Sequence, residues 1–244
     1  CCTGAGTTPG VSGSSQLQLM ELPVELRFPV GEGKVKVQLN RVTLNAGSPT
    51  IPAGGSPSPA GRADTQTAAG IAGSIGYTTD GVAIDVGQTP SGFIYKNFTG
   101  GVKLNGAIGG DDSLTYRVNL SRRPVTDSLL SFAGARDSTT GKTWGGVMAT
   151  GGRLDVTKDL GSYGFLGNAA WHQLRGQEVA SNGRAEVGFG SYVKVLRDAD
   201  SQLTTGMNFN SMAYQKNLSD FSFGQGGYFS PQRYRSVAFP IDWT

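Results

Sequence analysis

The sequence is short of cysteine, of charge and of long apolar runs. Its two cysteines, Cys1 and Cys2, are adjacent, so they cannot form disulfides that join distant segments. They are either a processing remnant or, at Cys1, a point of lipid attachment. No run of about 18 apolar residues occurs, which excludes a transmembrane helix, whereas strands that cross a membrane need only about 9 to 11 alternating residues. No secretory leader occurs, so we expect that any such leader has been removed.

Charged residues make up only 16% of the 244 residues, which is low for a surface in water. Lys and Arg number 21 against 18 Asp and Glu, and the longest basic run is Arg122–Arg123. Nucleic-acid binding requires a clustered basic stripe, so we predict no nucleic-acid partner. The low charge suits an outer surface that faces lipid, and it suits equally a secreted β-sandwich rich in Ser, Thr and Gly.

Residues that carry catalytic or metal chemistry are also scarce. The single histidine, His172, lies beside Trp171 in a predicted strand, where we interpret it as a lumen-facing or girdle residue. The sequence contains no GxSxG, GxGxxG or P-loop motif, and its His, Cys and carboxylate residues do not follow metal-ligand spacing. We predict no catalytic residue, no metal and no cofactor. A carboxylate pair that meets only in three dimensions is not excluded.

Glycine is abundant, at 38 of 244 residues, and short stretches alternate between apolar and polar residues. This alternation is typical of strands with one apolar face. A short helix or inward-folded segment is predicted at 128–132. About eleven strands are predicted, at 16–30, 34–45, 67–78, 82–86, 102–108, 114–121, 146–157, 162–174, 185–196, 202–214 and 235–243, with an interruption of the last at Pro240.

The first two predicted strands each change phase. Leu17 and Leu19 are out of phase with the apolar residues at 22–28, and the apolar residues at 42 and 44 are out of phase with those at 35–39. Because one inserted residue restores a common face, we predict β-bulges near Met20 and Asn40.

Short and long connections alternate along the chain. The short ones are Gly31–Gly33, Thr79–Gly81, Gly109–Asp112, Lys158–Gly161 and Asp198–Asp200, and the long ones are 46–66, 87–97, 122–145, 175–184 and 215–233. Outer-membrane barrels have short periplasmic turns and long external loops. On that rule the first strand would begin on the external side. Either residues 1–16 contain a further crossing or the rule is inverted here.

Four stretches resemble one family in the same order: DVGQTPSGF at 85–93, the segment 122–152, RDADSQL at 197–203 and GGYFSPQRY at 226–234. They are similar to the C-terminal barrel of the bacterial cellulose exporter, the outer-membrane component of the cellulose synthase system, and the resemblance covers roughly residues 17–243.

The resemblance implies a transmembrane, antiparallel, up-and-down β-barrel of sixteen strands. We therefore expect the chain to be C-terminally incomplete, with a flexible segment at 1–16 and a barrel domain at 17–244. The implied location is the bacterial outer membrane. The implied partners are the cellulose chain, outer-membrane lipid, a periplasmic helical-repeat region and the inner-membrane cellulose synthase complex.

Alternation assigns candidate residues to the two faces of the barrel. We expect Tyr163, Phe165, Trp171, Phe209 and Trp243 to face lipid or form girdles. Two loops, 122–145 and 221–233, are candidate gates whose glycines would allow movement, with Arg122, Arg123, Phe132, Trp144, Tyr228, Phe229, Gln232 and Arg233 as candidate residues. Candidates for the polar wall along the glycan path are Asp85, Lys103, Asn105, Arg117, Asn119, Glu186, Tyr192, Lys194, Asn208, Asn210 and Tyr214, of which the two tyrosines are preferred for sugar stacking.

The alternative to a barrel is a soluble, secreted β-sandwich that binds or hydrolyses glycans. A single strand does not separate the two, because the polar face of a sandwich strand meets bulk water where that of a barrel meets a wet lumen.

Overall fold

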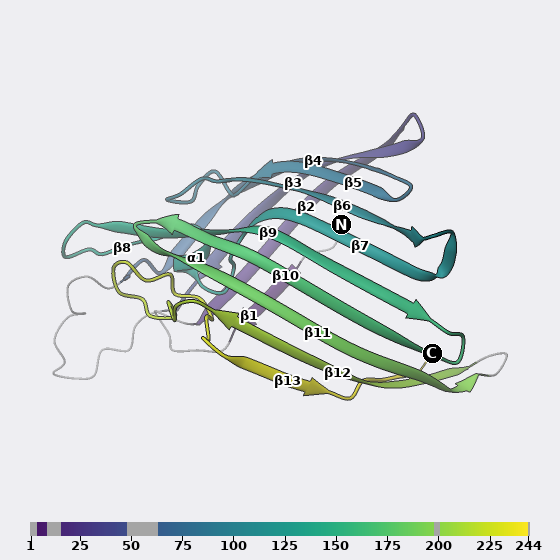
Figure 1. Cartoon of the computed structure of the whole chain (residues 1–244). Coiled ribbons are helices and arrows are strands. Elements are labelled where there is room, and N and C mark those ends of the chain that lie inside the picture. Colours follow the sequence, from purple (N-terminus) through teal and green to yellow (C-terminus); the bar gives the residue numbers. More distant parts are fainter. Residues whose placement is uncertain (1–3, 9–15, 48–62, 198–200, 244) are drawn as a thin grey trace.

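The structure is a computed structural model, and it describes residues 4–8, 16–47, 63–197 and 201–243. Nearly all of its regular structure is β-strand (Figure 1). The elements in chain order are β1 (Gly4–Thr8), β2 (Leu17–Val30), β3 (Gly33–Asn45), β4 (Thr67–Thr79), β5 (Val82–Gln88), β6 (Phe98–Ile108), β7 (Asp111–Pro124), α1 (Leu129–Ala133), β8 (Ala135–Arg136), β9 (Thr143–Asp159), β10 (Tyr163–Gln177), β11 (Val179–Arg197), β12 (Gln202–Tyr214), β13 (Tyr234–Ala238) and β14 (Ile241–Trp243).

The strands form one curved sheet in which chain neighbours pair antiparallel. The order is β1-β2-β3-β4-β5-β6-β7-β9-β10-β11-β12-β13, while the short β8 pairs with β9 and β14 continues along β12 beyond β13. The prediction of an all-β, up-and-down, barrel-type fold is confirmed for the described residues, although β1 and β13, at the two ends of this order, do not pair with each other there. Within the same residues, no helix is both long and apolar enough to cross a membrane.

The predicted strands correspond to β2–β7, β9–β12 and the β13–β14 pair, which is interrupted at Phe239–Pro240 as expected. Strand β1 was not predicted. It pairs antiparallel with β2, with Thr8 opposite Leu17, so the expectation of a flexible segment fails for Gly4–Thr8. Of the two alternatives for residues 1–16, the structure supports a further strand, which runs toward the end of the sheet where β2 begins.

The predicted long connection at 175–184 is wrong. Strand β10 continues to Gln177 and β11 starts at Val179, which leaves only Glu178, with a φ of 50°, in the turn. The stretch is polar and contains glycine, which is typical of a loop. It pairs as strand because a distant loop covers it: the backbone N–H of Ala180 donates to the carbonyl of Gly224 (3.0 Å).

Most other connections match their predicted lengths. Two-residue turns join β2 to β3, β4 to β5 and β6 to β7, and three residues join β9 to β10. Figure 1 shows these turns at one end of the sheet and α1 with the loop after β12 at the other. We call these the short-turn end and the long-loop end. The predicted turn at 198–200 lies outside the described residues, as does most of the predicted loop at 46–66.

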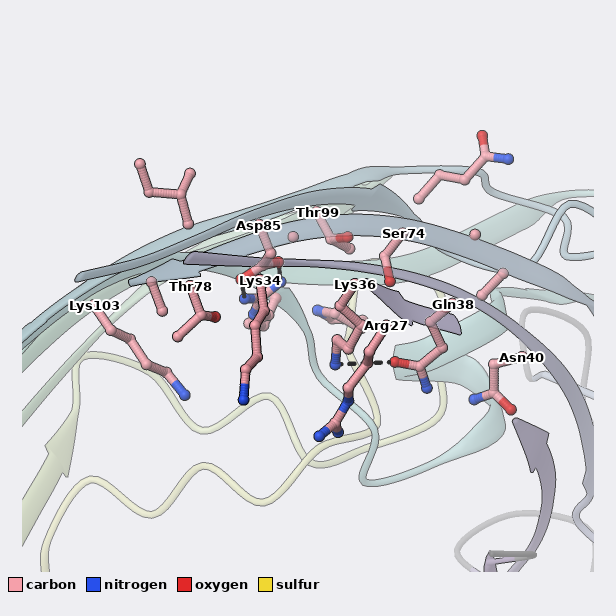
Figure 2. Close-up of a pocket in the computed structure, with 18 residues that line it drawn as sticks. Arg27, Lys34, Lys36, Gln38, Asn40, Ser74, Thr78, Asp85, Thr99 and Lys103 are labelled. Carbon is pink, nitrogen blue, oxygen red and sulfur yellow. Dashed lines mark hydrogen bonds and ion pairs between the residues drawn. The ribbon is translucent and has the colours of Figure 1, made fainter. Parts of the chain in front are cut away.

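Strand pairing places alternate residues on two unlike faces. Large apolar side chains stand exposed on the convex face of every long strand, among them Leu26, Ile75, Val86, Leu120 and Val187. The predicted girdle aromatics Tyr163, Phe165, Trp171, Phe209 and Trp243 are exposed as well. Polar side chains point to the inner, concave side (Figure 2).

The bulges predicted near Met20 and Asn40 are wrong. Pairing of β2 with β3 runs without a shift from Gln18 opposite Asn45 to Val30 opposite Gly33. The apolar residues that seemed out of phase point inward, where Leu17, Val42 and Leu44 are buried. The phase of the pattern therefore changes because the interior changes, from open at the short-turn end to packed at the long-loop end.

The packed end contains the two clusters of buried apolar residues. In the first, α1 and Trp144 pack against the start of β2 and the end of β3. In the second, Leu218 and Tyr228 of the loop after β12 pack against Val147, Leu174 and Tyr214 of the wall. We call the inward segments 89–97, 125–142 and 215–233 the inner plug.

Leu44 and Leu39 lie on opposite faces of β3, with exposed fractions of 0% and 55%. We expect Leu44→Ala to lower the free energy of unfolding by about 2–5 kcal/mol, because a cavity remains among rigid plug atoms. Leu39→Ala should cost less, because the medium outside the sheet refills the lost volume. Urea titration followed by tryptophan fluorescence measures both. Equal losses would contradict the inward orientation of Leu44.

Candidate functional site

The concave face brings together all of the residues predicted for the polar wall. Lys103 stands opposite Asn119 and Asn105 opposite Arg117 in the β6–β7 pair. Glu186, Tyr192 and Lys194 of β11 share this face with Asn208 and Asn210 of β12, as does Tyr214, and Asp85 lies on β5. Their position on one face is established by the register, and their contact with a glycan stays a prediction.

One part of this wall, on β2–β6, surrounds a hollow of about 650 Å³ near the short-turn end (Figure 2). Arg27, Lys34, Lys36 and Lys103 all line it. Arg123 of β7 reaches the same space and donates two hydrogen bonds to Asp85, from Nη1 to Oδ2 (2.7 Å) and from Nη2 to Oδ1 (2.5 Å). This bidentate geometry fixes the orientation of Asp85.

The opposite part of the wall, on β9–β11, carries charges that are paired with one another. Arg153 contacts Asp155 (2.8 Å), Arg184 contacts Glu186 (2.7 Å) and Lys194 contacts Asp159 (3.1 Å). A longer contact of 3.8 Å joins Arg153 to Glu186 and links two of these pairs. The wall on this side is therefore polar but nearly neutral.

His172 of β10 lies on the same part of the concave face as these ion pairs. Its Nδ1 lies 3.2 Å from Nη2 of Arg184, on the concave face, so the lumen-facing interpretation applies rather than the girdle one.

The two tyrosines preferred for sugar stacking differ in accessibility. Tyr192 is half-buried, with Nζ of Lys194 5.7 Å from its ring centroid. Tyr214 is only 7% exposed, and the ring of Tyr228 covers it at a centroid distance of 6.1 Å. The preference for Tyr214 is therefore wrong for the observed state, because the inner plug occupies the space that a sugar ring would need.

The inner plug begins with α1, a helix of one turn and a half. Its N-terminus has a capping box in which Oγ of Ser128 accepts from the backbone N–H of Ser131 (3.0 Å) and Oγ of Ser131 accepts from that of Ser128 (3.0 Å). A helix this short gains little from its own hydrogen bonds, so its stability depends on packing. All five of its residues are buried.

The loop after β12 is anchored to the wall by Asn182, a fully buried residue of β11. Its Nδ2 donates to the carbonyl of Lys216 (2.8 Å) and to Oη of Tyr228 (3.2 Å), and its Oδ1 accepts from the backbone N–H of Lys216 (2.9 Å). Burial raises the pKa of Tyr228 to about 12, so the hydroxyl stays protonated at neutral pH. Sequence reasoning placed Asn182 in a loop and missed this role.

The two gate candidates also contact each other. The backbone N–H of Phe229 donates to Oδ2 of Asp127 (3.0 Å), and Phe223 packs edge-on against Trp144 at 5.5 Å between ring centroids. The ammonium of Lys142 lies 4.7 Å from the centre of the same Phe223 ring. Loop segments about 80 to 100 residues apart in the sequence are therefore packed against each other.

The gate candidates are found in four different environments. Phe132 and Tyr228 are buried in the plug and Trp144 of β9 is buried against it, whereas Phe229, Gln232 and Arg233 are exposed on the plug surface. Arg123 lies on the concave face, and Arg122 points to the convex face, where it donates to the carbonyl of Phe98 (3.2 Å) and to Oγ1 of Thr150 (3.1 Å). Arg122 is therefore outside any gate in this state.

Gly145, at the end of the first gate loop, has a packing role, and the expectation that the glycines of the two loops allow movement stays a prediction. A Cβ atom at Gly145 would come within 2.2 Å of the carbonyl oxygen of Leu130, and the φ of Gly145 is +112°. This glycine permits close packing of α1 against β9.

The comparisons with known proteins agree on one family. A family model described as "Cellulose synthase operon protein C C-terminus" matches residues 15–244. The chain is 37% identical over 240 residues to the cellulose synthase operon protein C of Pseudomonas fluorescens (strain SBW25), covering 96% of this chain and 19% of that protein.

Two further relatives carry the same name. The protein of Xanthomonas axonopodis pv. citri (strain 306) is 43% identical over 180 residues, which are 74% of this chain and 12% of that protein. The protein of Escherichia coli (strain K12) is 34% identical over 248 residues, which are 96% of this chain and 21% of that protein. The chain thus spans about a fifth or less of the length of these relatives. It belongs to the family of the C-terminal region of cellulose synthase operon protein C, as the motifs at 85–93 and 226–234 predicted.

Proposed function

We propose that this chain forms the wall of an outer-membrane channel that passes nascent cellulose, a β-glucan, from the periplasm to the cell exterior. The observation that carries the proposal is the division of one sheet into an exposed apolar face and a polar concave face. The names of the relatives, which place them in a cellulose synthase operon, support the identity of the substrate.

Lipid is the environment that suits the convex face. Leu26, Val86 and Trp171 are each more than half exposed, and such residues recur on strand after strand around the sheet. A continuous apolar face of this extent would be unstable in water, since soluble proteins rarely expose apolar patches larger than a few hundred Å². The aromatic side chains near strand ends, such as Tyr163 and Trp243, match the interfacial girdles of membrane barrels.

The concave face suits a hydrated polysaccharide. Amides at Asn105, Asn119, Asn208 and Asn210 can donate to and accept from sugar hydroxyls. We propose that this wall conducts the glucan and performs no chemistry on it. In the whole protein, a periplasmic helical-repeat region and the inner-membrane synthase complex would deliver the chain.

The inner plug is the proposed gate. It fills the long-loop end of the concave face, and it is held to the wall by Asn182 and Tyr228. On this proposal, passage of a glucan past this point requires the plug to move away from the wall.

The soluble β-sandwich is the competing function class. A sandwich buries the apolar faces of two sheets against each other. The described strands form a single sheet, and its apolar face is the exposed one. This arrangement favours the membrane channel.

The first test is conduction. We expect the full-length protein, purified in detergent, to give steady conductance in a planar bilayer and to lose part of it when cellohexaose is added. Its mobility on gels should change when the sample is heated, as a folded barrel unfolds. A protein that stays soluble without detergent and does not conduct would support the sandwich and contradict the channel.

The second test concerns the plug. Tyr228→Ala removes a ring that is 2% exposed, which should destabilise the packing of the plug by about 3–5 kcal/mol. We expect a higher or less steady conductance in bilayers. The matched control is Phe229→Ala, whose side chain is 56% exposed. A folded Tyr228→Ala protein with unchanged conductance would contradict the gate.

A further inference from the structure

The hollow near the short-turn end holds more positive than negative charge. Five cations surround it: Arg27, Lys34, Lys36, Lys103 and Arg123. Only two carboxylates contact this group within the described part of the chain. Asp85 pairs with Arg123, and Glu25 contacts both Arg27 and, at 3.6 Å, Lys36.

Two of the cations have no ion-pair partner at all among the described residues. Lys34 and Lys103 come from β3 and β6 and both extend into the hollow (Figure 2). Carboxylates of the neighbouring turns, Glu32, Asp80 and Asp112, face water at the rim and form no ion pair with either lysine in the ranges that the structure describes. The described residues therefore leave the excess positive charge of the hollow without a neutralising partner.

The remaining charges of the concave face do not offset this excess. On β9–β11, three cations pair with three carboxylates. Arg117 stands between the two walls, opposite Asp155. Glu21 is on the face of β2 that carries Arg27, but it stands opposite Val42, toward the plug. The field along the concave face is thus asymmetric, positive over β2–β6 and near zero over β9–β11.

We propose that the hollow is a site for anionic groups carried by the passing glycan, such as carboxylate, phosphate ester or sulfate ester substituents. This inference rests on the proposed function, since it assigns a charge preference to the same path. A neutral glucan can accept hydrogen bonds from lysine, but an excess of positive charge gives it no Coulomb attraction, whereas an anionic substituent gains one. Cations in a concave wall attract anions from several ångströms, because the wall focuses the field and the Debye length is about 8 Å in physiological salt.

For binding an anionic group that moves along the wall, a lysine without an ion-pair partner is better suited than an arginine held in an ion pair. Its ammonium is a strongly hydrated point charge on a flexible stem, so it can follow a moving anionic group without holding it in one geometry. The bidentate contact in the hollow, between Arg123 and Asp85, is internal to the wall. Lys34 and Lys103 are therefore the cations that can contact anionic groups of a passing glycan.

The test compares binding of charged and neutral probes to the full-length protein in detergent by isothermal titration calorimetry. The probes are cellohexaose, cellohexaose that carries a single sulfate ester, and inorganic phosphate. We expect the sulfated hexaose to bind most tightly. In the triple variant that combines Lys34→Gln, Lys36→Gln and Lys103→Gln, the affinity for the sulfated hexaose should fall about tenfold, because three screened charge contacts are lost.

The control removes the same charge elsewhere. Arg41, Arg175 and Arg235 are exposed and lie outside both the hollow and the inner plug, and their change to Gln should leave the affinity for the sulfated hexaose within about twofold of wild type. Heat-dependent gel mobility verifies that both variants are folded.

Each result separates the two proposals. Equal affinity for neutral and sulfated hexaose, or no loss in the Lys→Gln variant, would overturn the anionic site. Phosphate that binds as tightly as the sulfated hexaose would overturn its assignment to a glycan. The channel itself is judged by the block of conductance with neutral cellohexaose, which should be the same in wild type and variant, so failure of the channel is distinguishable from failure of the site.

Discussion

Backbone hydrogen bonding between neighbouring antiparallel strands places every side chain of this sheet. Between β2 and β3 the ladder is continuous from Gln18 opposite Asn45 to Val30 opposite Gly33. Because alternate residues then point to opposite sides, neither face can shift its register without shifting the other. The exposed apolar surface, the polar concave wall and the packed plug all depend on this one constraint, and each strand must satisfy the three environments at once.

The plug imposes a second requirement. Its loop segments lie on the concave side of the sheet, where their buried backbone N–H and C=O groups need hydrogen-bond partners. Strand β11 supplies them. Its Asn182 bonds both polar groups of its side chain to the loop after β12, and the carbonyl of Gly183 accepts from the backbone N–H of Gln215 (2.9 Å). This explains why a polar stretch at 178–184 extends as strand beyond the apolar part of the sheet. The loop and the strand end stabilise each other.

The strands, the two-residue turns and the short helix could be predicted from sequence because their signals are local. Strand β1 could not, because GAGTT is too short and too poor in apolar residues to show alternation. The false bulges near Met20 and Asn40 had one cause, the assumption that the interior is uniform along its length. The polar wall followed from alternation alone. The burial of Tyr214 and Trp144 did not, because it depends on contacts with residues far away in the chain.

Strand β3 shows how much one alternating pattern can encode. Its inward residues run from Lys34, which has no ion-pair partner among the described residues, through Lys36 and the amide of Gln38 to the buried apolar side chains of Val42 and Leu44. At roughly 3.4 Å per residue, Lys34 and Leu44 stand about 34 Å apart. The unpaired cations and the packed plug are therefore at opposite ends of the same face, too far apart for one to neutralise or cover the other. A polymer on this face would meet charge attraction and the steric barrier as separate events, so the two are open to independent change by mutation.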